Sequence, residues 1–230
     1  MSVIGSALPF FFGSKAAVFN FLDPTNIGKS VQGGFFAGLI SYTADGVATH
    51  ALIVAPRATG ASGIDYPIGT SLSYKTTATP TTNTESTFDG SANTAVMVAD
   101  GIINYPCASF CVGLSLGGFT DWYMPAYLEL DIAFENLKPL GSINDTSFGI
   151  NAYSVPKRVT NRGPFSPGQS SVAAFQFGGA EAFEGSEHWS SSQNPGSTTQ
   201  GINISFTDAG RLGVSKTTIN RVRAFRKVVL

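Results

Sequence analysis

A run of three serines beside a histidine is the most obvious candidate for nucleophilic chemistry. Ser190, Ser191 and Ser192 follow His188 and Trp189 in the sequence. A catalytic serine needs a histidine base within hydrogen-bond reach and a third group that orients this base, and the G-x-S-x-G turn of many serine hydrolases is absent here. Because His188 is adjacent in the chain, it need not lie on the same face as a serine. We therefore expect Trp189 to pack in the core and the serines to hydrogen-bond to a turn.

Carboxylates can supply acid–base chemistry, and four of them lie close together in the sequence: Asp121, Glu129, Asp131 and Glu135. Asp131 and Glu135 are four residues apart on one side of a predicted helix, which we interpret as a solvated face. Glu129 lies near the start of that helix, where a negative charge is favourable. We expect no pair of these groups to be catalytic, and hence no enzymatic activity.

Cys107 and Cys111 are close enough in sequence to suggest a metal site or a disulfide. Two thiolates leave a zinc site two ligands short, and only His50 and His188 remain to complete it. A disulfide at this spacing requires an irregular turn with Cα atoms within about 7 Å. We predict buried free thiols, with the disulfide as the alternative. Calcium prefers several carboxylates, and the C-terminal region offers Asp208 alone. The sequence thus predicts neither a metal nor a cofactor.

One helix dominates the elements that must position these groups. Pro125 suits its first position, because the missing N–H of proline has no intrahelical partner there. Leu130, Phe134 and Leu137 then recur at helical spacing, and Pro139 ends the run.

Short strands and loops account for most of the remaining chain. The pair Asp45-Gly46 between two apolar runs predicts a hairpin of residues 35–42 and 50–55. Other apolar segments predict helices at 92–98 and 107–114 and strands at 72–75, 201–207, 211–215 and 220–228. Stretches rich in Ser, Thr, Asn, Gly and Pro predict loops over most of 57–94 and over 141–170. The pattern indicates an α+β fold with short strands, one or two helices and long loops.

The composition excludes several classes of partner. Charged residues make up only 13% of the chain, hydrophobic residues 43%, and the net charge is −1. This balance gives no electrostatic basis for binding nucleic acid or an anionic membrane. No apolar run is long enough to cross a bilayer, so we expect no membrane insertion. The alternating stretch Arg221–Arg226 is interpreted as a final strand with its polar residues on one face.

Residues 1–30 differ from the rest of the chain in their aromatic content. Five phenylalanines crowd this segment: Phe10, Phe11, Phe12, Phe19 and Phe21. Exposed apolar side chains mark interaction sites, so we predict an N-terminal arm for attachment and oligomerisation, followed by one domain over residues 31–230. The alternative is that the arm packs on its own domain.

Three segments resemble the signatures of one protein family, in the same order. The segments are Asp121-Trp122-Tyr123-Met124-Pro125 with Glu129-Leu130, similar to a D-W-x-L-P-x-x-x-E-L motif; His188–Gln193, similar to Y-W-S-S-[ST]-E; and Arg221–Arg226, similar to a terminal V-R-A-V-R. His188 and Gln193 depart from the usual Tyr and Glu. The family is the DUF1566/Lcl-type domain, whose fold is C-type-lectin-like.

Phage-borne members of this family are virion or tail-associated proteins, and some display a ligand-binding surface. The resemblance therefore implies a C-type-lectin-like subunit of a bacteriophage virion, on a tail, a tail fibre or a capsid, assembled in the host cytoplasm. The partners it implies are other virion subunits, further copies of the chain, and a host cell-surface receptor or glycan. One alternative is a purely structural decoration or tail-assembly subunit without a ligand. A second is an enzyme resembling formylglycine-generating enzymes, although both cysteines here precede the Asp-Trp motif.

Polar side chains between Trp189 and Arg221 form the candidate ligand-binding surface. Small polar groups on alternating strand positions offer adaptable hydrogen bonding, as in antibody loops. The candidates are Gln193, Asn194, Thr198, Thr199, Asn203, Ser205, Thr207, Arg211, Ser215, Thr217 and Asn220. Trp122, Trp189 and Arg223 are assigned to the scaffold. The alternative is that the polar residues only solvate an exposed face.

Overall fold

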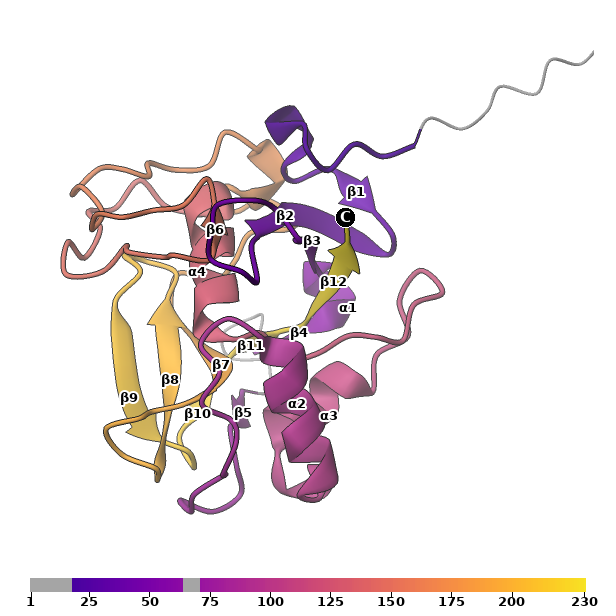
Figure 1. The fold of residues 1–230 in the computed structure, drawn as a ribbon, viewed down its shortest axis with the longest axis vertical. Helices are drawn as coiled ribbons and strands as arrows, with labels where there is room; N and C mark the ends of the chain where they lie inside the picture. The colour runs from indigo at the N-terminus through magenta and orange to yellow at the C-terminus, as the bar shows by residue number, and fades with distance from the viewer. Residues whose placement is uncertain (1–17, 64–70) are drawn as a thin grey trace, which may run out of the picture.

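The computed structural model describes residues 18–63 and 71–230. A central helix, α4 (Tyr127–Leu137), contacts β2 of a curled antiparallel sheet on one side and β7 and β8 of a smaller sheet on another (Figure 1). Strands predominate and helices are few, so the α+β class that the sequence predicts is confirmed. Among the described helices, none is long and apolar enough to cross a membrane.

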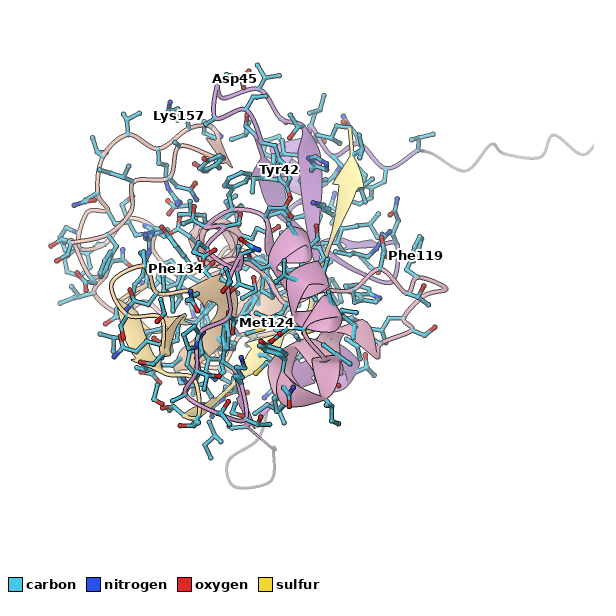
Figure 2. The ribbon with its side chains drawn as sticks, turned by 60° about the horizontal axis from the view of Figure 1, so that its bottom comes forward. Tyr42, Asp45, Phe119, Met124, Phe134 and Lys157 are labelled. Atoms are coloured by element: carbon cyan, nitrogen blue, oxygen red, sulfur yellow. The ribbon has the colours of Figure 1, made fainter. Side chains whose placement is uncertain are left out.

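The main sheet joins segments from both ends of the chain. Its order is β1 (Ser30–Val31), β2 (Gly34–Ile40), β3 (His50–Val54) and β12 (Phe225–Val229), and β6 (Ser154–Val155) also pairs with β2. All of these pairs are antiparallel. Strands β2 and β3 form the hairpin that the sequence predicts, and the turn between them receives a 3.1 Å hydrogen bond from Lys157 Nζ to the Ala44 carbonyl, close to Asp45 (Figure 2).

A bulge at Ala37 couples this sheet to α4. The pairing with β3 shifts between Phe36 and Gly38. The Ala37 carbonyl accepts a 2.8 Å hydrogen bond from Nδ2 of Asn136, on α4. Gly38 has a φ of +141°, and a Cβ there would lie 2.5 Å from the same Nδ2 atom. Glycine at this bulge therefore lets the helix lie close to the sheet.

Helix α4 begins two residues later than the sequence predicts. Ala126 is extended and serves as the N-cap, so Pro125 lies outside the helix. Because alanine has no polar side chain, the Ala126 N–H donates instead to Glu129 Oε2, at 2.8 Å. The same oxygen accepts the Gly90 N–H at 3.1 Å, at the start of α2. Glu129 is fully buried, and this burial raises its pKa to about 7.

Two apolar clusters fill the interior. One lies between α4 and the main sheet, and the other surrounds Trp122 and Trp189 together with α2 (Gly90–Ala99) and α3 (Pro106–Val112). Both of these helices are predicted by the sequence. Cys107 and Cys111 lie on α3 as buried free thiols, as predicted, and their burial raises the thiol pKa values.

The smaller sheet has the order β7 (Glu187–Gln193), β8 (Gln200–Ser205) and β9 (Arg211–Ser215), all antiparallel. Two short pairs connect it to the remainder of the chain. They are β10 (Ile219–Asn220) with β5 (Leu72–Ser73), and β11 (Val222–Arg223) with β4 (Ala61–Ser62), which follows α1 (Arg57–Gly60). Strand β9 is therefore the free edge of this sheet.

The prediction of one final strand with a polar face is wrong. The segment divides into β10, β11 and β12, and the arginines point into the protein. Arg223 is 1% exposed and donates to Glu181 Oε2 at 2.8 Å. Arg226 is 5% exposed and donates to Asp121 Oδ1 at 2.7 Å. Each guanidinium is satisfied by a carboxylate, so burial is tolerated.

The described end of the N-terminal arm packs on its own domain. The Phe19 and Phe21 rings lie 4.8 Å apart, and both contact the buried ring of Phe36 on β2, at 6.0 and 5.4 Å. The Gly28 N–H donates to the Phe36 carbonyl at 2.7 Å. Phe10, Phe11 and Phe12 lie outside the described residues.

Candidate functional site

A hollow of about 410 Å³ opens beside the turn between β8 and β9. Strand pairing places Asn203 opposite Leu212, and Ser205 opposite Glu187, on one face of the sheet. The turn after β8 and the loop after α4 complete its wall. The residues of the whole wall are Asp145, Ser147, Phe148, Glu187, Asn203, Ser205, Asp208, Gly210, Arg211 and Leu212. The volume lies in the range of small-molecule sites.

A second hollow of about 250 Å³ continues along β9. Its wall contains Phe148, Arg211 and Leu212 of the first hollow together with Tyr127, Asn194, Pro195, Ile202 and Gly213. The Asn194 amide lies over Gly213, where a Cβ would be 2.0 Å from Nδ2, and donates to Gln200 Oε1 at 2.9 Å. We call the two hollows together the β9 groove.

Arg211 lines both halves of the β9 groove and is held rigidly. Its guanidinium carbon lies 4.8 Å from the Tyr127 ring centroid and 5.2 Å from that of Phe148. Its Nη2 donates to Asp131 Oδ1 at 2.8 Å. Burial lowers the pKa of Arg211 to about 10, so the side chain stays charged at neutral pH.

The prediction that Asp131 and Glu135 form a solvated face is wrong. Asp131 is fully buried and pairs with three guanidinium groups, those of Arg158, Arg162 and Arg211. Glu135 pairs with Arg158 and Arg162. Solvent is largely excluded from this face of α4, because loop residues 141–170 cover it and supply Arg158 and Arg162. This cluster fixes the loop that carries Asp145 and Phe148 against α4.

The structure brings four of the predicted ligand-binding residues together in the β9 groove: Asn194, Asn203, Ser205 and Arg211. Thr207 lies next to the larger hollow, but its hydroxyl donates to the Gly185 carbonyl at 2.7 Å. The exposed or half-buried Thr198, Thr199, Ser215 and Thr217 lie at the opposite end of the sheet, where β8 begins and β9 ends. The candidates therefore form two separate surfaces.

Gln193 and Asn203 are only 2% exposed, so the prediction that they are displayed outward is wrong. The Gln193 Oε1 atom accepts a hydrogen bond from Lys216 Nζ and another from the Thr81 N–H, at 2.7 Å. Lys216 is itself fully buried and also donates to the Thr198 carbonyl, at 2.9 Å. These buried hydrogen bonds hold the end of β7 and the turn between β7 and β8 in place. Asn220 also has a buried Nδ2 atom, with no partner among the described residues.

Asn203 also has a buried amide atom without a partner in the described chain, and in this case the atom is an acceptor. Its Oδ1 atom is buried and has no hydrogen-bond partner within residues 18–63 and 71–230. A buried polar atom without a partner is unfavourable and calls for an explanation. Asn203 lies in the wall of the larger hollow.

Sequence reasoning missed the acidic and aromatic walls of the groove, which are Tyr127, Asp145, Phe148, Glu187 and Asp208. Asp208 was considered only as a lone carboxylate that is insufficient for calcium. Asp145 and Phe148 lie in a loop, where no periodicity predicts which side chains face a shared hollow.

The three serines are fully buried in β7, and the prediction that they hydrogen-bond to a turn is wrong. Ser190 Oγ donates to the Ile202 carbonyl at 2.7 Å, and Ser192 Oγ to the Ser86 carbonyl at 2.8 Å. His188 is buried beside Ser186, and burial lowers its pKa to about 3. No group of three or more His, Cys, Asp or Glu side chains in the described ranges is placed to hold a metal ion.

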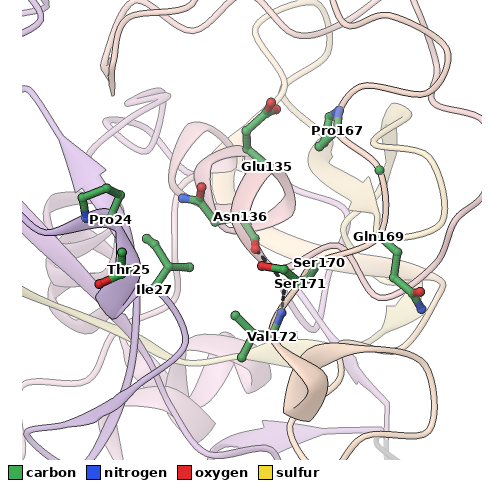
Figure 3. Close-up of a pocket in the computed structure, with 11 residues that line it drawn as sticks. Pro24, Thr25, Ile27, Glu135, Asn136, Pro167, Gln169, Ser170, Ser171 and Val172 are labelled. Atoms are coloured by element: carbon green, nitrogen blue, oxygen red, sulfur yellow. Dashed lines mark hydrogen bonds between the residues drawn. The ribbon is translucent and has the colours of Figure 1, made fainter.

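Two further hollows lie on either side of the N-terminal segment. The first, of about 440 Å³, separates residues 24–27 from the end of α4 and residues 167–172 (Figure 3). Within it, Ser170 Oγ donates to the Asn136 carbonyl at 2.9 Å and accepts the Val172 N–H at 3.2 Å. The second, of about 380 Å³, is mainly apolar and includes Phe21 and Leu22. Neither has a buried side-chain atom without a partner in its described wall.

Comparison of the chain with protein-family models, with curated proteins and with solved structures gives no match.

Proposed function

We propose that the chain is a C-type-lectin-like subunit of a bacteriophage virion and that it presents the β9 groove to a host receptor or glycan. The segments that carry the family resemblance contact one another, which supports a common scaffold. Asp121 accepts two hydrogen bonds from Arg226, at 2.7 and 2.9 Å. Tyr123 and Phe225 exchange backbone hydrogen bonds at 2.8 and 3.0 Å, and the Trp189 N–H donates to the Arg221 carbonyl at 2.7 Å.

The β9 groove is the observation that carries the recognition function. It lies along the free edge of a sheet and combines carboxylates, amides, two aromatic rings and the exposed side chain of Leu212. The arginine cluster around Asp131 holds its walls in place before any ligand arrives, which reduces the entropy lost on binding. Many copies on one particle add avidity to a weak single contact.

A purely structural role is the second candidate, and exposed aromatic residues favour it. Phe165 and Phe177 are 69% and 76% exposed, on the loops that follow α4. Large exposed apolar side chains are typical of surfaces that contact other subunits. In that case the loops after α4 contact neighbouring subunits and the β9 groove has no ligand.

The experiment uses purified phage particles whose protein content includes this chain by mass spectrometry. Leu212→Lys places a positive charge in both halves of the β9 groove, where the side chain is 58% exposed. Ile219→Lys is the matched control, because Ile219 is 66% exposed and lies outside the groove. We expect Leu212→Lys particles to assemble normally and to adsorb to host cells about tenfold less, which is a loss of about 1.4 kcal/mol. Ile219→Lys particles should adsorb as the wild type does.

Normal adsorption of the Leu212→Lys particles would show that the groove does not recognise the host. Loss of assembly with this variant, but not with Ile219→Lys, would favour the structural role. Absence of the chain from every purified particle would refute the virion assignment.

A further inference from the structure

The larger hollow of the β9 groove has an excess of negative charge. Asp145, Glu187 and Asp208 line it, and none of the three forms an ion pair with a described residue. Asp145 Oδ1 accepts the Ser147 N–H at 2.8 Å, and Asp208 Oδ1 accepts the Gly210 N–H at 2.9 Å. These bonds orient the carboxylates and leave their second oxygens for a ligand.

The cations near this hollow are committed to other acceptors. Arg211 is the one cation in its described wall; its Nη2 pairs with Asp131, and its buried Nε has no partner among the described residues. Arg158 and Arg162 pair with Asp131 and Glu135. Lys138 interacts electrostatically with Asp208. Its Nζ donates, however, to the Ser142 carbonyl, to Asn144 Oδ1 and to the Pro167 carbonyl, and none of these three residues lines the hollow. The three carboxylates therefore face the hollow without a counter-ion in contact.

Asn203 gives a second and independent indication of a missing donor. Asn203 is only 2% exposed, and it lines the same hollow. Its Oδ1 atom has no hydrogen-bond partner among the described residues. A carboxylate and an amide oxygen are acceptors only. The group that satisfies this set must carry several N–H or O–H donors, and a positive charge strengthens each of the bonds.

We propose that this hollow binds the ammonium group of an amino sugar on the host receptor. The ammonium offers three N–H donors, one for each of the carboxylates of Asp145, Glu187 and Asp208, and a neighbouring hydroxyl of the sugar is left to donate to the oxygen of Asn203. The ring of Phe148 in the same wall adds an attractive surface for a cation. This inference rests on the proposed recognition function and specifies its ligand class.

The adjoining hollow favours a saccharide over a lysine side chain. Tyr127, Pro195, Ile202 and Leu212 give it apolar surface, and the Asn194 amide lies at its edge. A pyranose ring has an apolar C–H face and hydroxyl groups around its rim, so a second sugar unit fits this combination. A lysine side chain ends at its ammonium and would leave the adjoining hollow empty.

Calorimetry on the full-length chain tests the proposal with a hexasaccharide of glucosamine and with its fully N-acetylated form, at a mildly acidic pH where the amine is charged. We expect the free-amine form to bind at least about tenfold more tightly, because acetylation removes the charge and two donors. Glu187→Gln and Asp145→Asn, which preserve shape, should each weaken that binding by about three- to tenfold and reduce its salt dependence. Asp23→Asn, in the N-terminal segment, removes one charge elsewhere and should change nothing.

Equal affinity for the two saccharides would overturn the ammonium site, as would hexalysine binding as tightly as the glucosamine form. Unchanged affinity in Glu187→Gln and Asp145→Asn would also overturn it. If neither saccharide binds while Leu212→Lys still impairs adsorption, this inference fails and the proposed function stands. If Leu212→Lys has no effect on adsorption either, both fail together.

Discussion

Replacing Asp131 by asparagine should destabilise the protein severely, although the sequence suggests a harmless surface position. The change keeps the shape of the side chain and removes the charge that faces Arg158, Arg162 and Arg211. Asp131 is 0% exposed, and Glu135 alone then remains to balance three guanidinium groups. Removing one partner of a buried ion pair costs about 3–5 kcal/mol, a large part of the roughly 5–15 kcal/mol that stabilises a typical domain.

Urea denaturation at neutral pH, followed by tryptophan fluorescence, measures this loss. With a slope near 2 kcal/mol per M, a loss of about 4 kcal/mol lowers the unfolding midpoint by about 2 M. Glu135→Gln is the matched control on the same helix, because the Glu135 side chain is 29% exposed and pairs with two of the same arginines. It should cost about 1 kcal/mol or less. A loss below about 1 kcal/mol for Asp131→Asn would refute the buried cluster.

Three further predictions concern buried titratable groups. Burial raises the pKa of Glu129 to about 7, above its unfolded value of 4.5, so its stabilising contribution is complete below pH 4.5 and is lost as the pH rises through 7. Relative to Glu129→Gln, the free energy of unfolding of the wild type, measured by urea titration, should fall by about 1.4 kcal/mol per pH unit across that window. Parallel plots of unfolding free energy against pH for the two proteins would contradict this. Burial lowers the pKa of His188 to about 3, below its usual 6.5, so the unfolded chain binds the extra proton and stability falls as the pH falls from 6.5. The replacement His188→Phe should remove that slope, and an unchanged slope would assign it to other groups. Cys107 and Cys111 are fully buried, so a thiol reagent should label them only on unfolding, and rapid labelling of the native protein would contradict their burial.

The sequence predicted the elements whose signals are local. The β2–β3 hairpin follows from Asp45-Gly46 between apolar runs, and α4 from the spacing of Leu130 and Phe134. The start of α4 was misplaced because its cap is supplied by Glu129, not by the N-cap residue itself. Such a cap depends on side-chain reach and cannot be read from periodicity.

The site was predicted only in part, because long-range contacts decide which polar residues face outward. Alternation along β8 correctly groups Asn203 with Ser205, but it does not show that Asn203 is buried while Ser205 is partly exposed. Gln193 is drawn inward by Lys216, more than twenty residues later in the chain. The helical spacing of Asp131 and Glu135 predicts a surface position for Asp131. Only the placement of Arg158 and Arg162 over it shows that it is buried.

The position of β12 has a consequence for the synthesis of this protein. Residues 225–229 pair with residues 50–54, so the main sheet gains its outer strand only after the ribosome has translated residues 55–224 as well. At typical elongation rates the edge of β3 waits on the order of ten seconds or more for its neighbour. During that time it is an open strand edge, to which another nascent chain on the same messenger can bind. A product that terminates before residue 225 lacks β12 altogether, so we expect cellular proteases to remove such incomplete chains.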